Sequence, residues 1–319
     1  MKTVKTVKTI ALIAIIFLIA YFYFLEFRIN WTELTKFRLI IRMHYLIAAF
    51  SLCLLAYLLE TFIWKICMNK HLGRHELTFN KSIAVVNASG LLKYLPGRIW
   101  MYTAQLLWLK KYGISKAIIF YANLICVLGS VIVSLYFGLI YLALYTHVMS
   151  KKAIVLSFIV LILSNTAYIA WNSMLMNKLI TFVNKLLKKD IRPLKSSGSL
   201  LLFIQAIYMC SWLLTGFSGY FLAKGIGLPV AVTGIFALLA SMSLSWVAGY
   251  FAVISPGGLG IREGVMLVML NNVVNVQTAL IFPLVSRVMY LIAEALLGLT
   301  ALLLGMKYNI FSSKERATD

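Results

Sequence analysis

Residues 255–263 read SPGGLGIRE, and this stretch decides what kind of fold the chain can adopt. It follows the apolar run Val230–Ile254, which is long enough to cross a bilayer. A proline and three glycines interrupt a helix, and the adjacent Arg262 and Glu263 are costly at membrane depth. Broken backbone survives there only where protein covers it or where it lines a wet cavity. The stretch therefore predicts a helix break built around a polar site.

The composition around this break is that of a membrane protein. Hydrophobic residues make up 62% of the 319-residue chain and charged residues only 12%. Soluble domains average about 45–50% and about 25%, respectively. We therefore expect an all-α, polytopic protein with seven or eight transmembrane helices in a single integral membrane domain. Residues 10–306 would be embedded, and residues 307–319 would form a polar tail.

The predicted spans are the apolar runs of sufficient length. They lie near Ile10–Leu25, Tyr45–Trp64, Ala117–Tyr145, Ala153–Trp171, Leu200–Ala223, Val230–Ile254 and Thr278–Leu304. The first run is expected to be retained, because no small-residue cleavage site follows it. Two further segments do not fit this pattern. Ile83–Leu109 is interrupted by charged residues and by Pro96-Gly97, and Gly264–Val276 is short, so both are predicted to be half-helices or re-entrant segments.

The positive charges indicate an orientation. The formal net charge is +21, but the cations lie in short loops beside apolar runs, which argues against a nucleic-acid partner. With the amino terminus in the cytoplasm, the inner segments hold 16 cations and the outer loops 7. The positive-inside rule supports this orientation. We expect a multi-pass protein of the cytoplasmic (inner) membrane with its amino terminus in the cytoplasm. Seven spans would leave the carboxyl end outside and an eighth would bring it inside; the sequence leaves both open.

The segment 172–199 is predicted to be a basic cytoplasmic loop. Within it, apolar residues of 177–189 recur at helical spacing between lysines. That pattern fits a helix in the headgroup layer, and it equally fits a solvated connector.

The two breaks suggest a possible internal repeat. Residues 95–98 read LPGR, and the Pro-Gly-Gly of the second break follows 160 residues later. Paired broken helices in corresponding halves are typical of transporters, which bind substrate between them. We therefore expect the two breaks to meet and to form a polar groove.

Acidic residues are scarce, with nine in the whole chain. No aspartate cluster is available to hold a divalent ion, so we expect no metal site and no cofactor, and we assign no catalytic residue. Within the predicted membrane region, four cations face two acids, which favours either internal ion pairs or the binding of a phosphate headgroup. The candidate substrate-binding residues are Lys93, Tyr94, Pro96, Gly97, Arg98, Ser255, Pro256, Gly257, Gly258, Gly260, Arg262, Glu263, Arg287 and Glu294.

Two stretches carry a family resemblance. Residues 93–100 (KYLPGRIW) with 110–115 (KKYGIS), and residues 255–264 (SPGGLGIREG), are similar to two signatures of the lysylphosphatidylglycerol synthase transmembrane-region family. The stretch 284–287 (LVSR) also fits. The resemblance covers residues 10–306. It implies a flippase-like membrane protein, commonly with eight spans and both ends inside.

The chain departs from this family in two places. Many relatives carry a glutamate near the position of Asn123, so its absence leaves the mechanism open. The soluble aminoacyl-transfer domain fused to some relatives is missing, so we do not expect the chain to make lysylphosphatidylglycerol by itself.

The leading functional hypothesis is a non-enzymatic translocase. Its substrate would be an anionic phospholipid or a polyprenyl-phosphate-linked glycan, held by Arg98 and Arg262, while Glu263 and Arg287 pair and unpair. The first alternative is an integral-membrane transferase that uses a polyprenyl-phosphate sugar, with Glu263 as its acid or base. The second is a non-catalytic membrane partner of an enzyme of lipid or glycan synthesis. The expected partners are membrane lipids.

Overall fold

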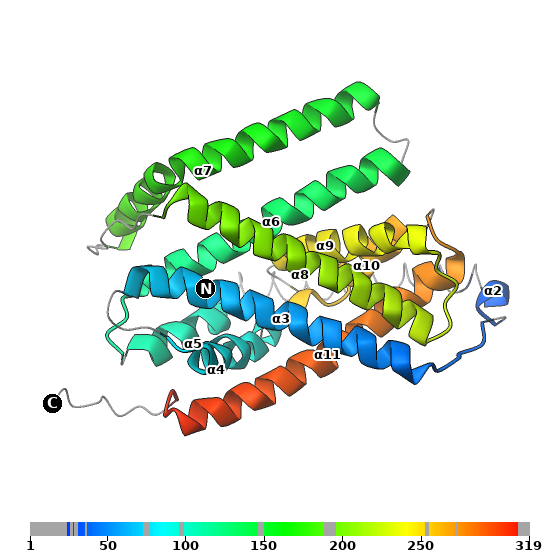
Figure 1. The fold of residues 1–319 in the computed structure, drawn as a ribbon, viewed down its shortest axis with the longest axis horizontal. Helices are drawn as coiled ribbons and strands as arrows, with labels where there is room; N and C mark the ends of the chain where they lie inside the picture. Colours follow the sequence, from blue (N-terminus) through cyan, green and yellow to red (C-terminus); the bar gives the residue numbers. More distant parts are fainter. Residues whose placement is uncertain are drawn as a thin grey trace, which may run out of the picture. The chain divides into compact units, whose positions relative to one another are not determined.

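The structure is a computed structural model that describes residues 24–25, 28, 31–35, 37–72, 77–95, 99–110, 112–145, 150–187, 196–252, 255–271 and 273–311. Every regular element in these residues is helical, which confirms the all-α prediction (Figure 1). The elements in chain order are α2 (Trp31–Thr35), α3 (Met43–Leu72), α4 (Phe79–Gly90), η1 (Leu91–Tyr94), α5 (Ile99–Lys110), α6 (Lys116–Tyr145), α7 (Lys151–Leu187), α8 (Gly198–Gly225), η2 (Val232–Gly234), α9 (Ile235–Phe251), η3 (Pro256–Gly258), α10 (Ile261–Leu270) and α11 (Val276–Lys307).

Six helical stretches are long and apolar enough to cross a membrane. They are Met43–Leu72, Lys116–Tyr145, Lys151–Ala170, Gly198–Gly225, Val232–Phe251 and Val276–Lys307. Each coincides with a predicted span; the remaining prediction, Ile10–Leu25, lies almost wholly outside the described residues. Large apolar side chains on α7, including Leu156 (61% exposed) and Leu163 (63% exposed), face outward. A surface of this kind is stable against lipid, so the chain is a multi-pass membrane protein.

The two interrupted segments are confirmed as short helices. The predicted segment Ile83–Leu109 holds α4, η1 and α5, and α4 and α5 have 12 residues each. The second predicted segment, Gly264–Val276, overlaps the 10-residue α10, which begins earlier than predicted, at Ile261, shortly after η3. A helix of 12 residues extends only about 18 Å, which is less than the hydrocarbon thickness of a bilayer. None of the short helices α4, α5 and α10 is therefore long enough to cross the membrane by itself.

The segment 172–199 is only partly a loop. Helix α7 continues to Leu187, and α8 begins at Gly198. Polar residues in a predicted loop do not exclude a helix, because a helix satisfies its own backbone and leaves its side chains to water or headgroups. The helical spacing within 177–189 was the signal for this continuation.

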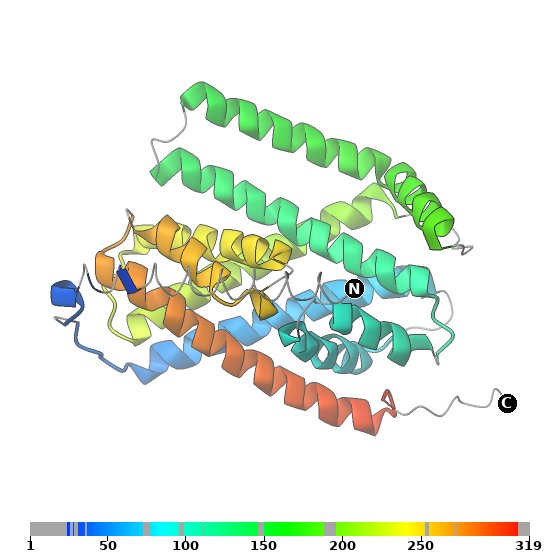
Figure 2. The ribbon, with the colours of Figure 1, turned by 180° about the vertical axis from the view of Figure 1, so that it is seen from behind.

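The chain divides into two compact units. The first comprises Met1–Ala56, Leu91–Trp100 and Trp212–Leu296, and the second Tyr57–Gly90, Met101–Ser211 and Leu297–Asp319. Within the first unit, α9 and α10 lie side by side, joined by η3, as both views show (Figures 1 and 2). Three long helices, α3, α8 and α11, contribute residues to both units.

Small residues let helices of the first unit approach closely. A Cβ added at Gly216 of α8 would lie 2.8 Å from Leu239 Cβ of α9. A Cβ at Gly219 would lie 2.7 Å from Met242 Sδ of α9 and 3.0 Å from Phe282 Cζ of α11. Contacts between small residues and larger side chains are typical of helix packing in membranes, where lipid supplies no hydrophobic driving force. They hold α8, α9 and α11 together.

The second unit combines an apolar cluster with amide hydrogen bonds. Ile83 and Ala88 of α4 pack with Ala301 of α11, and neighbouring apolar side chains surround them. Gln105 Nε2 donates to Ser89 Oγ at 2.9 Å, and Asn123 Nδ2 donates to Gln105 Oε1 at 2.8 Å. These bonds link α4, α5 and α6. Buried amides are tolerated because their polar atoms are paired.

Candidate functional site

The second break has a backbone that requires glycine. Gly257, Gly258 and Gly260 have φ angles of +61°, +75° and +82°. Only glycine adopts this left-handed region without a steric penalty. Ser255, which is 1% exposed, donates its hydroxyl to the carbonyl of Leu259 at 2.7 Å and so closes the turn. The SPGGLG sequence thus forms a tight, hydrogen-bonded turn that leads directly into α10.

Glu263 lies in the first turn of α10 and caps it. Its Oε2 accepts a hydrogen bond from the backbone N–H of Gly260 at 2.6 Å. A carboxylate at this position satisfies a free N–H of the helix end and interacts favourably with the helix dipole. The residue is only 5% exposed. The local sequence Gly-x-x-Glu therefore fixes a buried negative charge at the break.

Arg287 of α11 joins this carboxylate to the turn. Its Nη2 donates to the carbonyl of Gly257 at 3.1 Å, and its Nε lies 3.4 Å from Glu263 Oε1. Both side chains are buried, at 7% and 6% exposure. The ion-pair contact is long, and neither atom has hydrogen-bond geometry with a described partner. The prediction that Arg287 and Glu263 pair is confirmed, and the pair is loose.

A second, tighter ion pair lies at the first break. Lys93 of η1 contacts Glu294 of α11, with Nζ 2.6 Å from Oε1. The hydroxyl of Tyr94 donates to the other carboxylate oxygen of Glu294. Glu294 is 9% exposed. Its carboxylate is therefore held by two donors from a segment about 200 residues away in the chain.

Tyr94 connects the two breaks. A Cβ added at Gly257 would lie 2.5 Å from Tyr94 Cε1, so the ring rests directly on the glycine backbone. The guanidinium carbon of Arg287 lies 5.8 Å from the centre of the same ring, within the range of a cation–π interaction. Elements η1 and η3 are in contact. The segment just before the first break thus contacts the second break, while the meeting of the breaks themselves stays a prediction.

Arg262 lies across two glycines. A Cβ at Gly249 of α9 would be 2.5 Å from Arg262 Cγ, and one at Gly258 would be 3.0 Å from Arg262 Nε. The positive charges of Arg262 and Arg287 both act on Lys93. Gly249 was not predicted as part of the site. A single glycine in an apolar span gives no sign of which side chain it accommodates.

We refer to Lys93, Arg262, Glu263, Arg287 and Glu294 as the charge cluster. Three cations and two carboxylates leave a surplus of one positive charge in a buried or half-buried setting. Such a surplus favours an anion with several acceptor oxygens, and guanidinium groups suit phosphate in particular. Among the described residues, no three His, Cys, Asp or Glu side chains group as metal ligands.

The structure brings most of the candidate residues together. Ser255 to Gly260 form the turn, and the charge cluster and Tyr94 surround it. Pro96, Gly97 and Arg98 lie outside the described residues. The proposed role of Arg98 therefore stays a prediction from the sequence. Asn123 lies in the second unit, bonded to Gln105 and to the carbonyl of Ile119.

Gly257→Ala is expected to destabilise the protein by about 2–3 kcal/mol. Alanine at φ +61° is strained, and its Cβ would displace the Tyr94 ring. The measurement is the thermal unfolding of purified protein in detergent. Gly264→Ala is the matched control, because no atom lies within 4 Å of a Cβ there and the position is helical; it should be neutral or slightly stabilising. Equal stability of both variants would contradict the described turn.

These features define a class: a polytopic helical membrane protein with an ion-paired polar site where two interrupted helices meet. The chain belongs to the lysylphosphatidylglycerol synthase transmembrane-region family, whose sequence model, described as "Lysylphosphatidylglycerol synthase TM region", matches residues 9–298. This membership confirms the resemblance carried by the two break motifs and places the chain among membrane proteins of lipid metabolism or translocation. A search of curated proteins gave no match.

Proposed function

We propose that this protein translocates a phosphate-bearing lipid headgroup across the cytoplasmic membrane. The headgroup belongs to an anionic phospholipid or to a polyprenyl-phosphate-linked glycan. The observation that carries the proposal is the charge cluster, a buried site with surplus positive charge at two helix breaks. Ionisable residues at membrane depth are costly and usually mark a transport pathway. Broken helices in a membrane have the same association with binding sites.

The two ion pairs would have different roles in this mechanism. At 2.6 Å the Lys93–Glu294 contact has the length of a strong charge-assisted bond. At 3.4 Å the Arg287–Glu263 contact does not. A phosphate oxygen can offer Arg287 better hydrogen bonds than Glu263 does, so the looser pair opens to the ligand. The tighter Lys93–Glu294 pair keeps η1 attached to α11 while the Arg287–Glu263 pair opens.

Arg262 would make the first contact with the phosphate. It is half-buried, whereas Arg287 is 6% exposed. Its side chain is supported by the glycine backbones of α9 and η3, which fix its direction. The acyl or polyprenyl chains would remain in lipid. The sequence contains no Walker A motif, so movement would run downhill or be coupled to an ion or to consumption of the product.

Arg262→Ala is expected to slow headgroup translocation by about tenfold to hundredfold, the range for loss of a charge-assisted hydrogen bond. Arg262→Lys should fall between the wild type and Arg262→Ala, because lysine keeps the charge but lacks the planar fork. The assay follows the accessibility of a labelled phosphatidylglycerol headgroup in reconstituted vesicles. Arg38→Ala, at an exposed arginine, is the matched control. Wild-type rates for Arg262→Ala would remove the site assignment.

The transferase alternative gains no support from the geometry of Glu263. One carboxylate oxygen caps α10, and the other faces Arg287. A general base must be able to accept a proton from substrate, and an oxygen committed to structure is poorly placed for that role. Absence of product when the purified protein is given labelled polyprenyl-phosphate sugar and acceptor is the expected result.

A further inference from the structure

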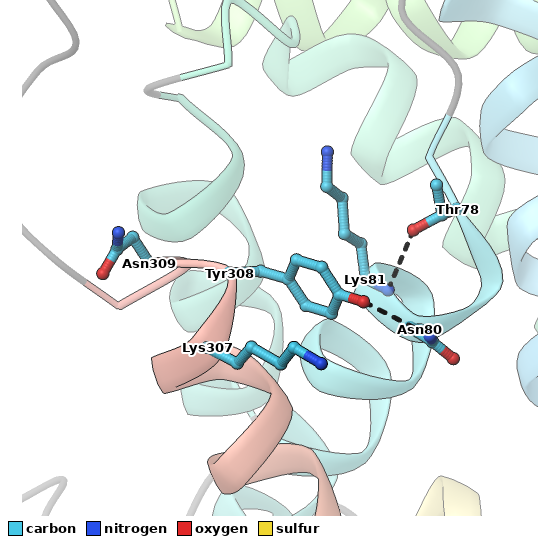
Figure 3. Close-up of a pocket in the computed structure, with 6 residues that line it drawn as sticks. All are labelled: Thr78, Asn80, Lys81, Lys307, Tyr308 and Asn309. Atoms are coloured by element: carbon cyan, nitrogen blue, oxygen red, sulfur yellow. Dashed lines mark hydrogen bonds between the residues drawn. The ribbon is translucent and has the colours of Figure 1, made fainter.

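A cavity of about 440 Å³ lies in the second unit, and none of its lining residues belongs to the charge cluster. It is formed by the start of α4 and the end of α11 (Figure 3). The lining residues are Thr78, Asn80, Lys81, Lys307, Tyr308 and Asn309. Two are cations and none is acidic. The volume falls within the usual range for small-ligand sites.

The two lysines lie on either side of the Tyr308 ring (Figure 3). Lys307 Nζ is 5.9 Å from the centre of this ring, and Lys81 Nζ is 5.8 Å from the centre of the Tyr112 ring. In the part of the chain that the structure describes, the ion pairs involve neither lysine. Both ammonium groups therefore retain donors for a ligand in or above the cavity.

The wall between the lysines is held in place. The hydroxyl of Tyr308 accepts a hydrogen bond from Asn80 Nδ2 at 3.3 Å. The backbone carbonyl of Tyr308 accepts a hydrogen bond from the Tyr112 hydroxyl, also at 3.3 Å. Because the Tyr308 hydroxyl oxygen accepts the bond from Asn80, the hydroxyl proton of Tyr308 is available to an acceptor such as a phosphate oxygen. Beyond it, Ile310 N–H bonds to the carbonyl of Gly305 at 2.7 Å and ends α11. The cavity is thus a defined concave site rather than a mobile tail.

The surroundings point to the membrane surface. Lys307 ends a helix long enough to span, and Leu303 and Met306, one turn or less away, are 65% and 59% exposed. An apolar strip next to lysine and tyrosine donors is the arrangement expected at the level of lipid headgroups. Inorganic phosphate and soluble phosphate esters present the same phosphate oxygens as a lipid headgroup, but without acyl chains.

We propose that this cavity is a second anion site, which binds the phosphate of a membrane lipid or of a soluble phosphate ester through Lys81, Lys307 and Tyr308. It does not rest on the proposed translocation, because none of its residues belongs to the charge cluster. A lipid held here joins the carboxyl end of α11 to the start of α4.

The test is native mass spectrometry of full-length protein stripped of lipid in detergent. Dioctanoyl phosphatidylglycerol, dioctanoyl phosphatidylcholine and glycerol 3-phosphate are titrated separately. The Lys81→Gln/Lys307→Gln variant should weaken one class of phosphatidylglycerol binding by on the order of 25-fold, from about fivefold for each lysine near a membrane surface. Lys151→Gln/Lys152→Gln, which removes the same charge from an exposed helix start, should bind like wild type.

The arms separate the sources of the phosphate. Weakened phosphatidylglycerol binding with no glycerol 3-phosphate binding supports a lipid headgroup, and weakened binding of both supports a soluble ester. Equal binding by the wild type and the Lys81→Gln/Lys307→Gln variant overturns the proposal. The Tyr308→Phe variant, which removes only the hydroxyl, provides a second measurement if the double variant folds poorly. Translocation is measured separately, so failure of the central site leaves this result intact.

Discussion

Arg287→Met is expected to destabilise the protein by about 3–5 kcal/mol, the largest single effect on stability at the charge cluster. The change leaves Glu263 buried at 5% exposure without its cation, and it leaves the carbonyl of Gly257 without its donor. An uncompensated buried charge costs more than the ion pair contributes. The measurement is equilibrium unfolding in mixed detergent micelles.

A double-mutant cycle separates the pair from general damage. Glu263→Gln retains an acceptor oxygen for the Gly260 N–H while removing the charge. Combined with Arg287→Met, it should recover part of the stability lost in the single variant, because no unpaired charge remains. Strict additivity of the two single effects would show that Arg287 and Glu263 are not coupled.

Glu294→Ala is expected to abolish most translocation, with a fall of at least about hundredfold. The variant removes the acceptor of both Lys93 and Tyr94, which together attach the first break to α11. A site displaced by about 1 Å can lose two orders of magnitude in rate. The assay is the headgroup accessibility measurement in reconstituted vesicles.

A charge exchange provides the control for this second effect. The variant Lys93→Glu/Glu294→Lys keeps an ion pair between the same two positions and the same net charge. We expect it to recover thermal stability above that of Glu294→Ala, and to translocate poorly because a cation and an anion have changed places. Wild-type translocation by Glu294→Ala would exclude the pair from the mechanism.

The spans and the breaks were predictable from the sequence because each depends on local chemistry. Length and apolar content identified α3, α6, α8, α9 and α11. Proline and glycine identified the turn at residues 255–260, because proline does not continue a helix and only glycine adopts the positive φ of positions 257, 258 and 260 without strain. The end of α7 was left open, since a basic segment with helical spacing fits both a helix in the headgroup layer and a solvated connector.

The partners of the charges were only partly predictable. The pairing of Arg287 with Glu263 was expected, but the sequence left open whether Glu294 forms an ion pair and with which cation; it contacts Lys93 and Tyr94. Which cation reaches a buried acid depends on helix register and on contacts between distant segments. The packing of the Arg262 side chain against Gly249 and Gly258 could not be predicted for the same reason.

The two ion pairs have a consequence for the response to membrane voltage. Lys93 and Arg287 are balanced by Glu294 and Glu263, so these four charges sum to zero. A rearrangement that keeps both pairs closed moves no net charge through the electric field. An anion that crosses the bilayer does move net charge through the field, and its free energy changes by about 2.3 kcal/mol per elementary charge for each 100 mV. The membrane potential would therefore act on the cargo, whereas the two ion pairs are electrically silent as long as they stay closed.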